Sequence, residues 1–165
     1  MAADAAELYK EDFYAWTRAQ AAALRRLAAE QWNGPLDLDR LAEEVEDLGS
    51  SERYTVESQI QRLIIHLLKL EYSPAAQPRR QWRLSVLNAR AEIERRLSNA
   101  MRGEVEARLD KLYGTARAAA RIELVEHDEL ASAELLPKSC PYNWSQLLDP
   151  EWIPVNRHGL TDPEF

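Results

Sequence analysis

Apolar residues recur at helical spacing through three long stretches of the chain that contain no proline. These stretches are 1–34, 36–73 and 79–136, and they favour helices because proline breaks a helix interior. Leucine and alanine number 23 and 24, whereas valine, isoleucine and threonine together number 16, which disfavours a substantial sheet. The sequence therefore predicts an all-α protein.

The spacing of apolar positions predicts about five helices. The first ends before the helix-breaking sequence Asn33-Gly34-Pro35, and Asp37 is a good N-cap for the second. Gly49 suits the position just after that helix, so a tight turn there would fold the second and third helices into an antiparallel hairpin. The fourth ends before Gly103. The predicted helices cover about 6–31, 38–48, 51–71, 79–102 and 104–127.

The last 35 residues are rich in proline, and the sequence predicts an irregular C-terminal tail there. A short helix is expected after Asn143, because Asn143 and Gln146 have capping-box spacing. At 165 residues the chain is expected to form a single helical domain over 1–165, which is a usual length for one domain. Its helical core would cover about 6–130, and the tail, about 131–165, would lie over this bundle as a strap.

Charge divides the chain into three segments. Residues 1–57 carry a net charge of −7, residues 58–102 carry +6, and residues 103–165 carry −6. No apolar window is long enough to span a membrane, and the acidic start Met1-Ala-Ala-Asp4 is unlike a secretory signal. The single Cys140 cannot form an internal disulfide. We therefore expect a cytoplasmic protein that is not inserted in a membrane.

The basic middle segment contains a candidate phosphate or nucleic-acid surface on the fourth helix. Its arginines are Arg79, Arg80, Arg83 and Arg90, and Trp82 beside them could stack on a base. Alternatively, these arginines pair with the acidic helices of the same chain. The net charge of −7 favours this second interpretation, because nucleic-acid-binding domains are usually basic overall.

A candidate metal or proton-transfer site consists of Glu44 and His66. If the second and third helices form a hairpin, the two side chains can face one groove, where a carboxylate beside an imidazole could bind a divalent metal. No Glu precedes any histidine by three residues, as helical di-metal sites require. We favour structural roles for both residues, and we predict no cofactor and no catalytic residue.

Several short sequences in the chain resemble a bacterial family described only as domain of unknown function number 29. The matching sequences are Leu8-Tyr9, Asp12-Phe13, Trp16, Leu24-Arg25, Leu36-Asp37, Leu41-Ala-Glu-Glu-Val-Glu46, Gly49, Ser58, His66-Leu-Leu-Lys69, Tyr72, Trp82, Arg90, Ile93, Tyr113, Ala116, Cys140-Pro-Tyr142, Leu147-Leu-Asp149 and Pro154. The resemblance implies an all-helical fold and no particular activity.

The charge distribution and the incomplete catalytic sets favour a non-enzymatic module that binds another macromolecule. The expected partner is a protein or a second copy of this chain. A nucleic-acid-associated protein using the basic fourth helix is the first alternative. A metal-dependent enzyme using Glu44 and His66 is the second.

Overall fold

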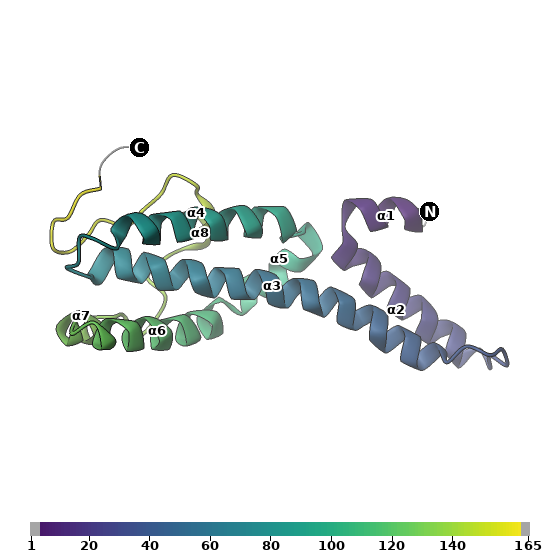
Figure 1. Ribbon diagram of the computed structural model, residues 1–165. Helices are drawn as coiled ribbons and strands as arrows, with labels where there is room; N and C mark the ends of the chain where they lie inside the picture. Colours follow the sequence, from purple (N-terminus) through teal and green to yellow (C-terminus); the bar gives the residue numbers. More distant parts are fainter. Residues whose placement is uncertain (1–3, 163–165) are drawn as a thin grey trace. The chain divides into compact units, whose positions relative to one another are not determined.

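The structure, a computed structural model, describes residues 4–162, which form eight α-helices and no strand (Figure 1). The all-α prediction is confirmed, whereas the predicted number of about five helices is too small. None of the described helices combines the length and apolarity needed to cross a membrane. The helices are α1 Ala5–Glu11, α2 Phe13–Ala29, α3 Leu38–Tyr72, α4 Arg79–Arg96, α5 Asn99–Ala107, α6 Leu109–Glu126, α7 Leu130–Glu134 and α8 Trp144–Leu148.

Asp12 divides the predicted first helix into α1 and α2. Its backbone leaves the helical region, with φ −148° and ψ 89°, and its side chain accepts a hydrogen bond from the Ala15 amide at 2.9 Å. The second carboxylate oxygen accepts from the Ala100 amide at 3.2 Å. Capping of α2 and the contact with α5 therefore stabilise a break that the apolar spacing does not reveal.

The predicted hairpin at Gly49 is wrong, because α3 continues through this position as one helix from Leu38 to Tyr72. Gly49 is buried against α2, and a Cβ atom there would lie 2.2 Å from Oγ1 of Thr17. The glycine allows a close approach of two helices and does not end one.

The predicted break at Gly103 is also displaced along the chain. Helix α4 ends at Arg96, and Gly103 lies inside α5. The hydroxyl group of Ser98 accepts a hydrogen bond from the Met101 amide at 3.2 Å, which caps the start of α5. The helix boundary therefore lies about five residues before the glycine.

The described residues form two compact units. Unit 1 consists of residues 4–55 and 96–105, and unit 2 of residues 56–95 and 106–162. In unit 1, Tyr14 donates a hydrogen bond to Glu104 at 2.7 Å and accepts one from Arg18 at 2.6 Å. Arg18 also pairs with Glu46 of α3 at 2.9 Å. This polar network joins α2, α3 and α5.

The second half of α3 forms the centre of unit 2, where it lies between α4 and α6 (Figure 1). Most of its apolar side chains are buried, as are several that α4 and α6 direct toward it. Because this part of α3 has apolar residues on nearly every side, it needs neighbours on opposite faces. The buried apolar residues include Val56, Ile60, Leu63, Ile64, Leu67, Leu68, Val86, Ala89, Ile93, Ala116 and Ala120.

The predicted irregular, proline-rich tail is not supported, because the segment contains α7 and α8. The predicted short helix after Asn143 is present. Its capping box is complete: Asn143 accepts from the Gln146 amide at 2.8 Å, and Gln146 accepts from the Asn143 amide at 3.0 Å. Further along, the buried Asn156 donates to the carbonyl groups of Leu70 and Ser73 at 2.8 and 2.9 Å. The segment after α7 is thus part of the packing of unit 2.

Candidate functional site

The structure does not bring Glu44 and His66 together. Both residues belong to α3, and His66 stands 22 residues after Glu44 in that uninterrupted helix, a separation of about six turns. The predicted pairing required the hairpin at Gly49, which does not form. Among residues 4–162, no group of three or more His, Cys, Asp or Glu side chains is arranged to hold a metal ion.

His66 has a local structural contact. Its Nδ1–H donates to the Arg62 carbonyl oxygen at 2.7 Å, one helical turn earlier. Burial lowers the pKa of the imidazole, and the nearby Lys69 charge acts in the same direction. His66 is therefore held in its neutral form within the packing of unit 2.

Arg79, at the start of α4, is directed into the protein. It is 4% exposed, and its guanidinium group forms a double hydrogen bond with Asp162 at 2.7 and 2.8 Å. The remaining terminal nitrogen donates to the Leu70 carbonyl oxygen at 2.8 Å. The Arg79 contact holds the pKa of the Asp162 carboxyl group below its usual range. Arg79 thus joins three segments of unit 2.

Arg90, three turns further along α4, is also buried, at 5% exposure. Its Nε donates to the Leu147 carbonyl oxygen at 2.9 Å, and Nη2 donates to the Gln146 carbonyl oxygen at 3.0 Å. Nη1 is buried and has no hydrogen-bond partner. Burial lowers the pKa of this guanidinium group. Arg90 holds the end of α8 beside α4.

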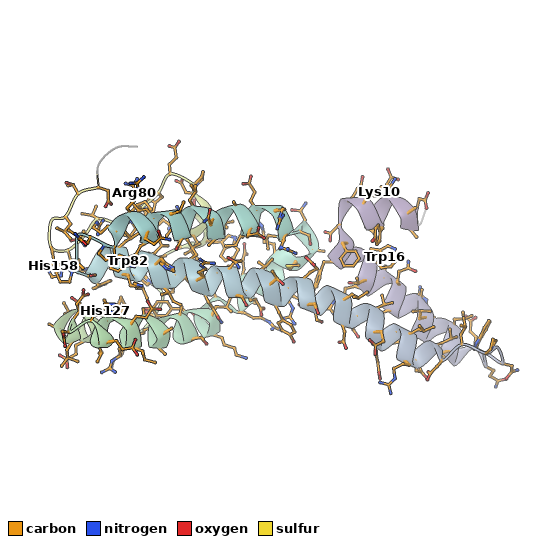
Figure 2. The ribbon with its side chains drawn as sticks, in the orientation of Figure 1. Lys10, Trp16, Arg80, Trp82, His127 and His158 are labelled. Carbon is orange, nitrogen blue, oxygen red and sulfur yellow. The ribbon has the colours of Figure 1, made fainter. Side chains whose placement is uncertain are left out.

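Between α4 and the segment that follows α8 lies an open groove with a volume of about 780 Å³. Arg80, Arg83 and Arg90 line it together with one acidic residue, Glu151, and with apolar side chains of both segments. Figure 2 shows Arg80 on the side of α4 opposite Trp82, which faces α3. The apolar lining consists of Leu84, Val86, Leu87, Pro150 and Ile153. Of the four arginines identified in the sequence, three therefore meet at this groove, and Arg79 does not line it.

Leu84 and Leu87 also line the groove, and the sequence did not predict them as site residues. They are 46% and 54% exposed, although leucines of a helix in a folded protein are usually buried. With Arg80 they follow the spacing i, i+4, i+7, which places them on one helix face. The spacing of Leu84 and Leu87 on a face away from Trp82 was the feature of the sequence that could have indicated this groove.

The family model described as domain of unknown function DUF29 matches residues 8–153. The chain belongs to the DUF29 family. No curated protein matches the sequence. A crystal structure of an alpha-helical protein of unknown function from Rhodospirillum rubrum resembles this DUF29 chain with a TM-score of 0.76 and 25% sequence identity. The match covers 87% of this chain and 90% of the other, so the helical fold extends over most of both proteins.

Proposed function

We propose that this DUF29 protein is a protein-binding module whose groove along α4 holds an acidic, amphipathic segment of a partner protein. The observation that carries the proposal is the joint presence of Leu84 and Leu87, about half exposed, beside Arg80 and Arg83 in one groove. Exposed apolar side chains with a charged rim are typical of protein-interaction surfaces.

The size and shape of the groove support a helical segment as the occupant. Leu84 and Leu87 lie on one side of a concavity of about 780 Å³, and Pro150 and Ile153 lie on the other. An amphipathic helix presents apolar side chains at i, i+3, i+4 and i+7 to such a groove. Its apolar face would cover the two leucines.

The charges at the groove favour an acidic occupant. Arg80 is exposed at the lining, and a guanidinium group binds a carboxylate through paired hydrogen bonds. The lining has three arginines against one acidic residue, Glu151. The chain as a whole carries a net charge of −7. A basic groove on an acidic protein selects an acidic segment by electrostatic complementarity and repels it elsewhere.

The nucleic-acid alternative receives less support from the same residues. Arg79 and Arg90 donate to groups of their own chain, so their charge is not presented to a phosphate backbone. The exposed Arg80 alone would neutralise few phosphates, and the adjacent leucines would contribute nothing to backbone binding. An apolar groove fits a protein segment better.

Binding can be tested with fluorescently labelled synthetic peptides. The probe is a helix of about 14 residues, or four turns, with leucines at i, i+3, i+4 and i+7 and glutamates on both flanks. A peptide with lysine in place of each glutamate and a scrambled peptide serve as comparisons. Fluorescence anisotropy should show saturable binding of the glutamate peptide only, and this binding should weaken as the salt concentration rises.

The variant Arg80→Glu should weaken binding of the glutamate peptide by at least about tenfold, a loss of about 1.4 kcal/mol. Arg95→Glu is the matched control, because Arg95 is exposed on the same helix and does not line the groove. Equal binding of the glutamate and lysine peptides would contradict the proposal. Binding of a labelled oligonucleotide with a steep, linear dependence of log affinity on log salt would favour the nucleic-acid alternative instead.

A further inference from the structure

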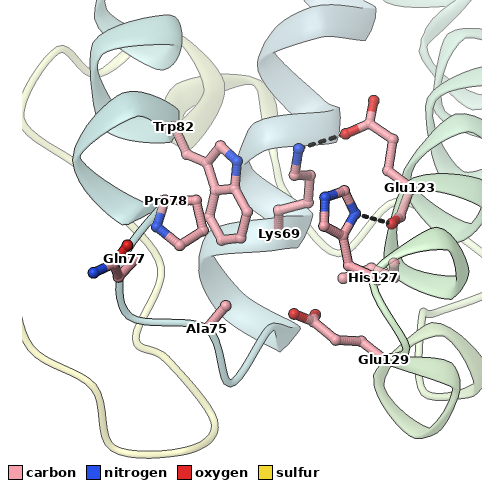
Figure 3. A pocket seen from close by; sticks show the side chains of 9 residues that line it. Lys69, Ala75, Gln77, Pro78, Trp82, Glu123, His127 and Glu129 are labelled. Atoms are coloured by element: carbon pink, nitrogen blue, oxygen red, sulfur yellow. Dashed lines mark hydrogen bonds and ion pairs between the residues drawn. The ribbon is translucent and has the colours of Figure 1, made fainter.

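A second pocket of unit 2 shares one lining residue, Gln77, with the groove, and none of the groove's arginines line it. It has a volume of about 420 Å³ and lies where the connection from α3 to α4 passes the end of α6 (Figure 3). Pro78, Trp82 and Leu124 provide apolar walls. This volume is in the range of small-molecule sites.

The cationic group of this pocket is already neutralised. Lys69 is 9% exposed and pairs with Glu123 of α6. Its ammonium group also lies 4.7 Å from the ring centroid of Trp82, a cation–π contact. The charges of Lys69 and Glu123 cancel, so neither attracts a further ion strongly.

Glu129 provides a carboxylate oxygen without a hydrogen-bond partner in this pocket. It precedes α7, and its side chain forms no capping hydrogen bond with that helix. Its Oε2 atom is buried and has no hydrogen-bond partner. In Figure 3 the Glu129 carboxylate points into the pocket from the side opposite Trp82. Burial of a carboxylate oxygen without a hydrogen-bond partner raises the free energy of the folded protein, and a bound hydrogen-bond donor would remove this cost.

His127 supplies a second acceptor. Its Nδ1 lies 2.7 Å from the Glu123 carbonyl oxygen. A carbonyl oxygen can only accept, so in the neutral ring Nδ1 carries the hydrogen and Nε2 remains an acceptor. The pocket therefore offers two acceptors, one of them anionic, beside apolar walls.

We propose that this pocket binds a primary ammonium group carried on a small apolar body. The ammonium group would donate to Glu129 and His127 and balance the Glu129 charge, and the apolar body would pack against Pro78 and Trp82. A free small amine and a lysine side chain of a partner protein share this chemistry. The residues that would bind the ammonium group, Glu129 and His127, do not line the groove along α4.

Isothermal titration calorimetry with three compounds of similar size tests the charge requirement. The compounds are 2-phenylethylamine, 2-phenylethanol and 3-phenylpropionate. The amine should bind at least about tenfold more tightly than the alcohol or the carboxylate. A short peptide with blocked termini and one lysine forms the second arm. Preference for phenylethylamine indicates a free amine as the ligand, and preference for the peptide indicates a partner's lysine. Saturable binding of neither would overturn the proposal.

Two variants locate the site. Glu129→Gln keeps the shape of the side chain and removes its charge, so amine affinity should fall by at least about tenfold. His127→Ala should also weaken amine binding, and His127 is exposed, so the fold should tolerate this change. Glu126→Gln is the control, because Glu126 is exposed on α6 and does not line the pocket. This variant should bind the amine as the wild type does. Unchanged amine binding in both Glu129→Gln and His127→Ala would overturn the proposal.

Discussion

Arg90 and Leu147 are 57 positions apart in the sequence and are joined by a hydrogen bond of 2.9 Å from the guanidinium Nε to the carbonyl oxygen. A second bond, from Nη2 to the Gln146 carbonyl oxygen, has a length of 3.0 Å. These two bonds fix the end of α8 beside α4, and the chain directly after α8 provides the other wall of the groove. Arg90 therefore positions this wall.

Replacement of Arg90 by alanine should strongly destabilise the protein. The change leaves two carbonyl groups without their donor and removes a buried side chain, for which we expect a loss of about 2–4 kcal/mol in the free energy of unfolding. Urea denaturation measures this loss. Arg95→Ala is the control: Arg95 forms an exposed ion pair with Glu92, so its loss should cost less than about 1 kcal/mol. Equal stability of the two variants would contradict the role of Arg90.

Gly49→Ala should destabilise the protein, although alanine is the better helix former. The added Cβ would lie 2.2 Å from Oγ1 of Thr17, and Thr17 is fully buried and donates to the Tyr14 carbonyl oxygen at 2.8 Å. The expected loss is about 1–3 kcal/mol. Thermal or urea unfolding measures it.

Gly114→Ala in α6 is the matched control for this substitution. No atom lies within 4 Å of a Cβ atom added there, so the variant should gain about 0.5–1 kcal/mol from helix propensity alone. A gain of similar size for Gly49→Ala would mean that the contact with Thr17 does not constrain this position.

The sequence predicted the helical class because long stretches between prolines carry apolar stripes. It misplaced the helix ends wherever a distant residue determines them. Gly49 has the local features of a helix end, yet it serves the contact with Thr17 of α2. Asp12 lies inside a regular apolar pattern, yet it caps α2 and binds the Ala100 amide. The capping box at Asn143 was predictable because both of its partners lie within four residues.

The candidate site residues show the same difference between partners that are close in the sequence and partners that are distant. The sequence identified the arginines of α4 but could not show that Arg79 binds Asp162 and that Arg90 binds the end of α8. These partners are 83 and 57 positions away, and local spacing carries no information about such contacts. Glu44 and His66 were placed together only through the predicted hairpin.

His66 should make stability depend on pH near neutrality. Because burial lowers the pKa of the folded imidazole below the unfolded value of about 6.5, the unfolded state binds a proton first as the pH falls. The free energy of unfolding should therefore decrease below about pH 6.5. In His66→Gln this part of the pH dependence should be absent, as urea denaturation at a series of pH values can measure. An identical pH dependence in the wild type and in His66→Gln would contradict this role of His66.

Ionisation of Asp162 should make the free energy of unfolding depend on pH in a more acidic range than His66 does. The pKa of Asp162 is lowered, chiefly by the hydrogen bond from Arg79, so its stabilisation is present above about pH 4 and is lost as the pH falls through the lowered pKa. Asp162→Asn should be less stable than the wild type at neutral pH. The difference should shrink as the pH drops below about 4. A difference that is constant over this range would exclude ionisation of Asp162 as its cause.

The most direct test of the groove as the binding site is a methyl NMR titration with the glutamate-flanked peptide. Chemical-shift changes should concentrate at Leu84, Leu87 and Ile153, which line the groove. Leu41 and Leu48 are exposed leucines of α3 that do not line it, and their signals should stay in place. Shifts at Leu41 and Leu48 with unchanged signals at Leu84, Leu87 and Ile153 would contradict the proposed binding site.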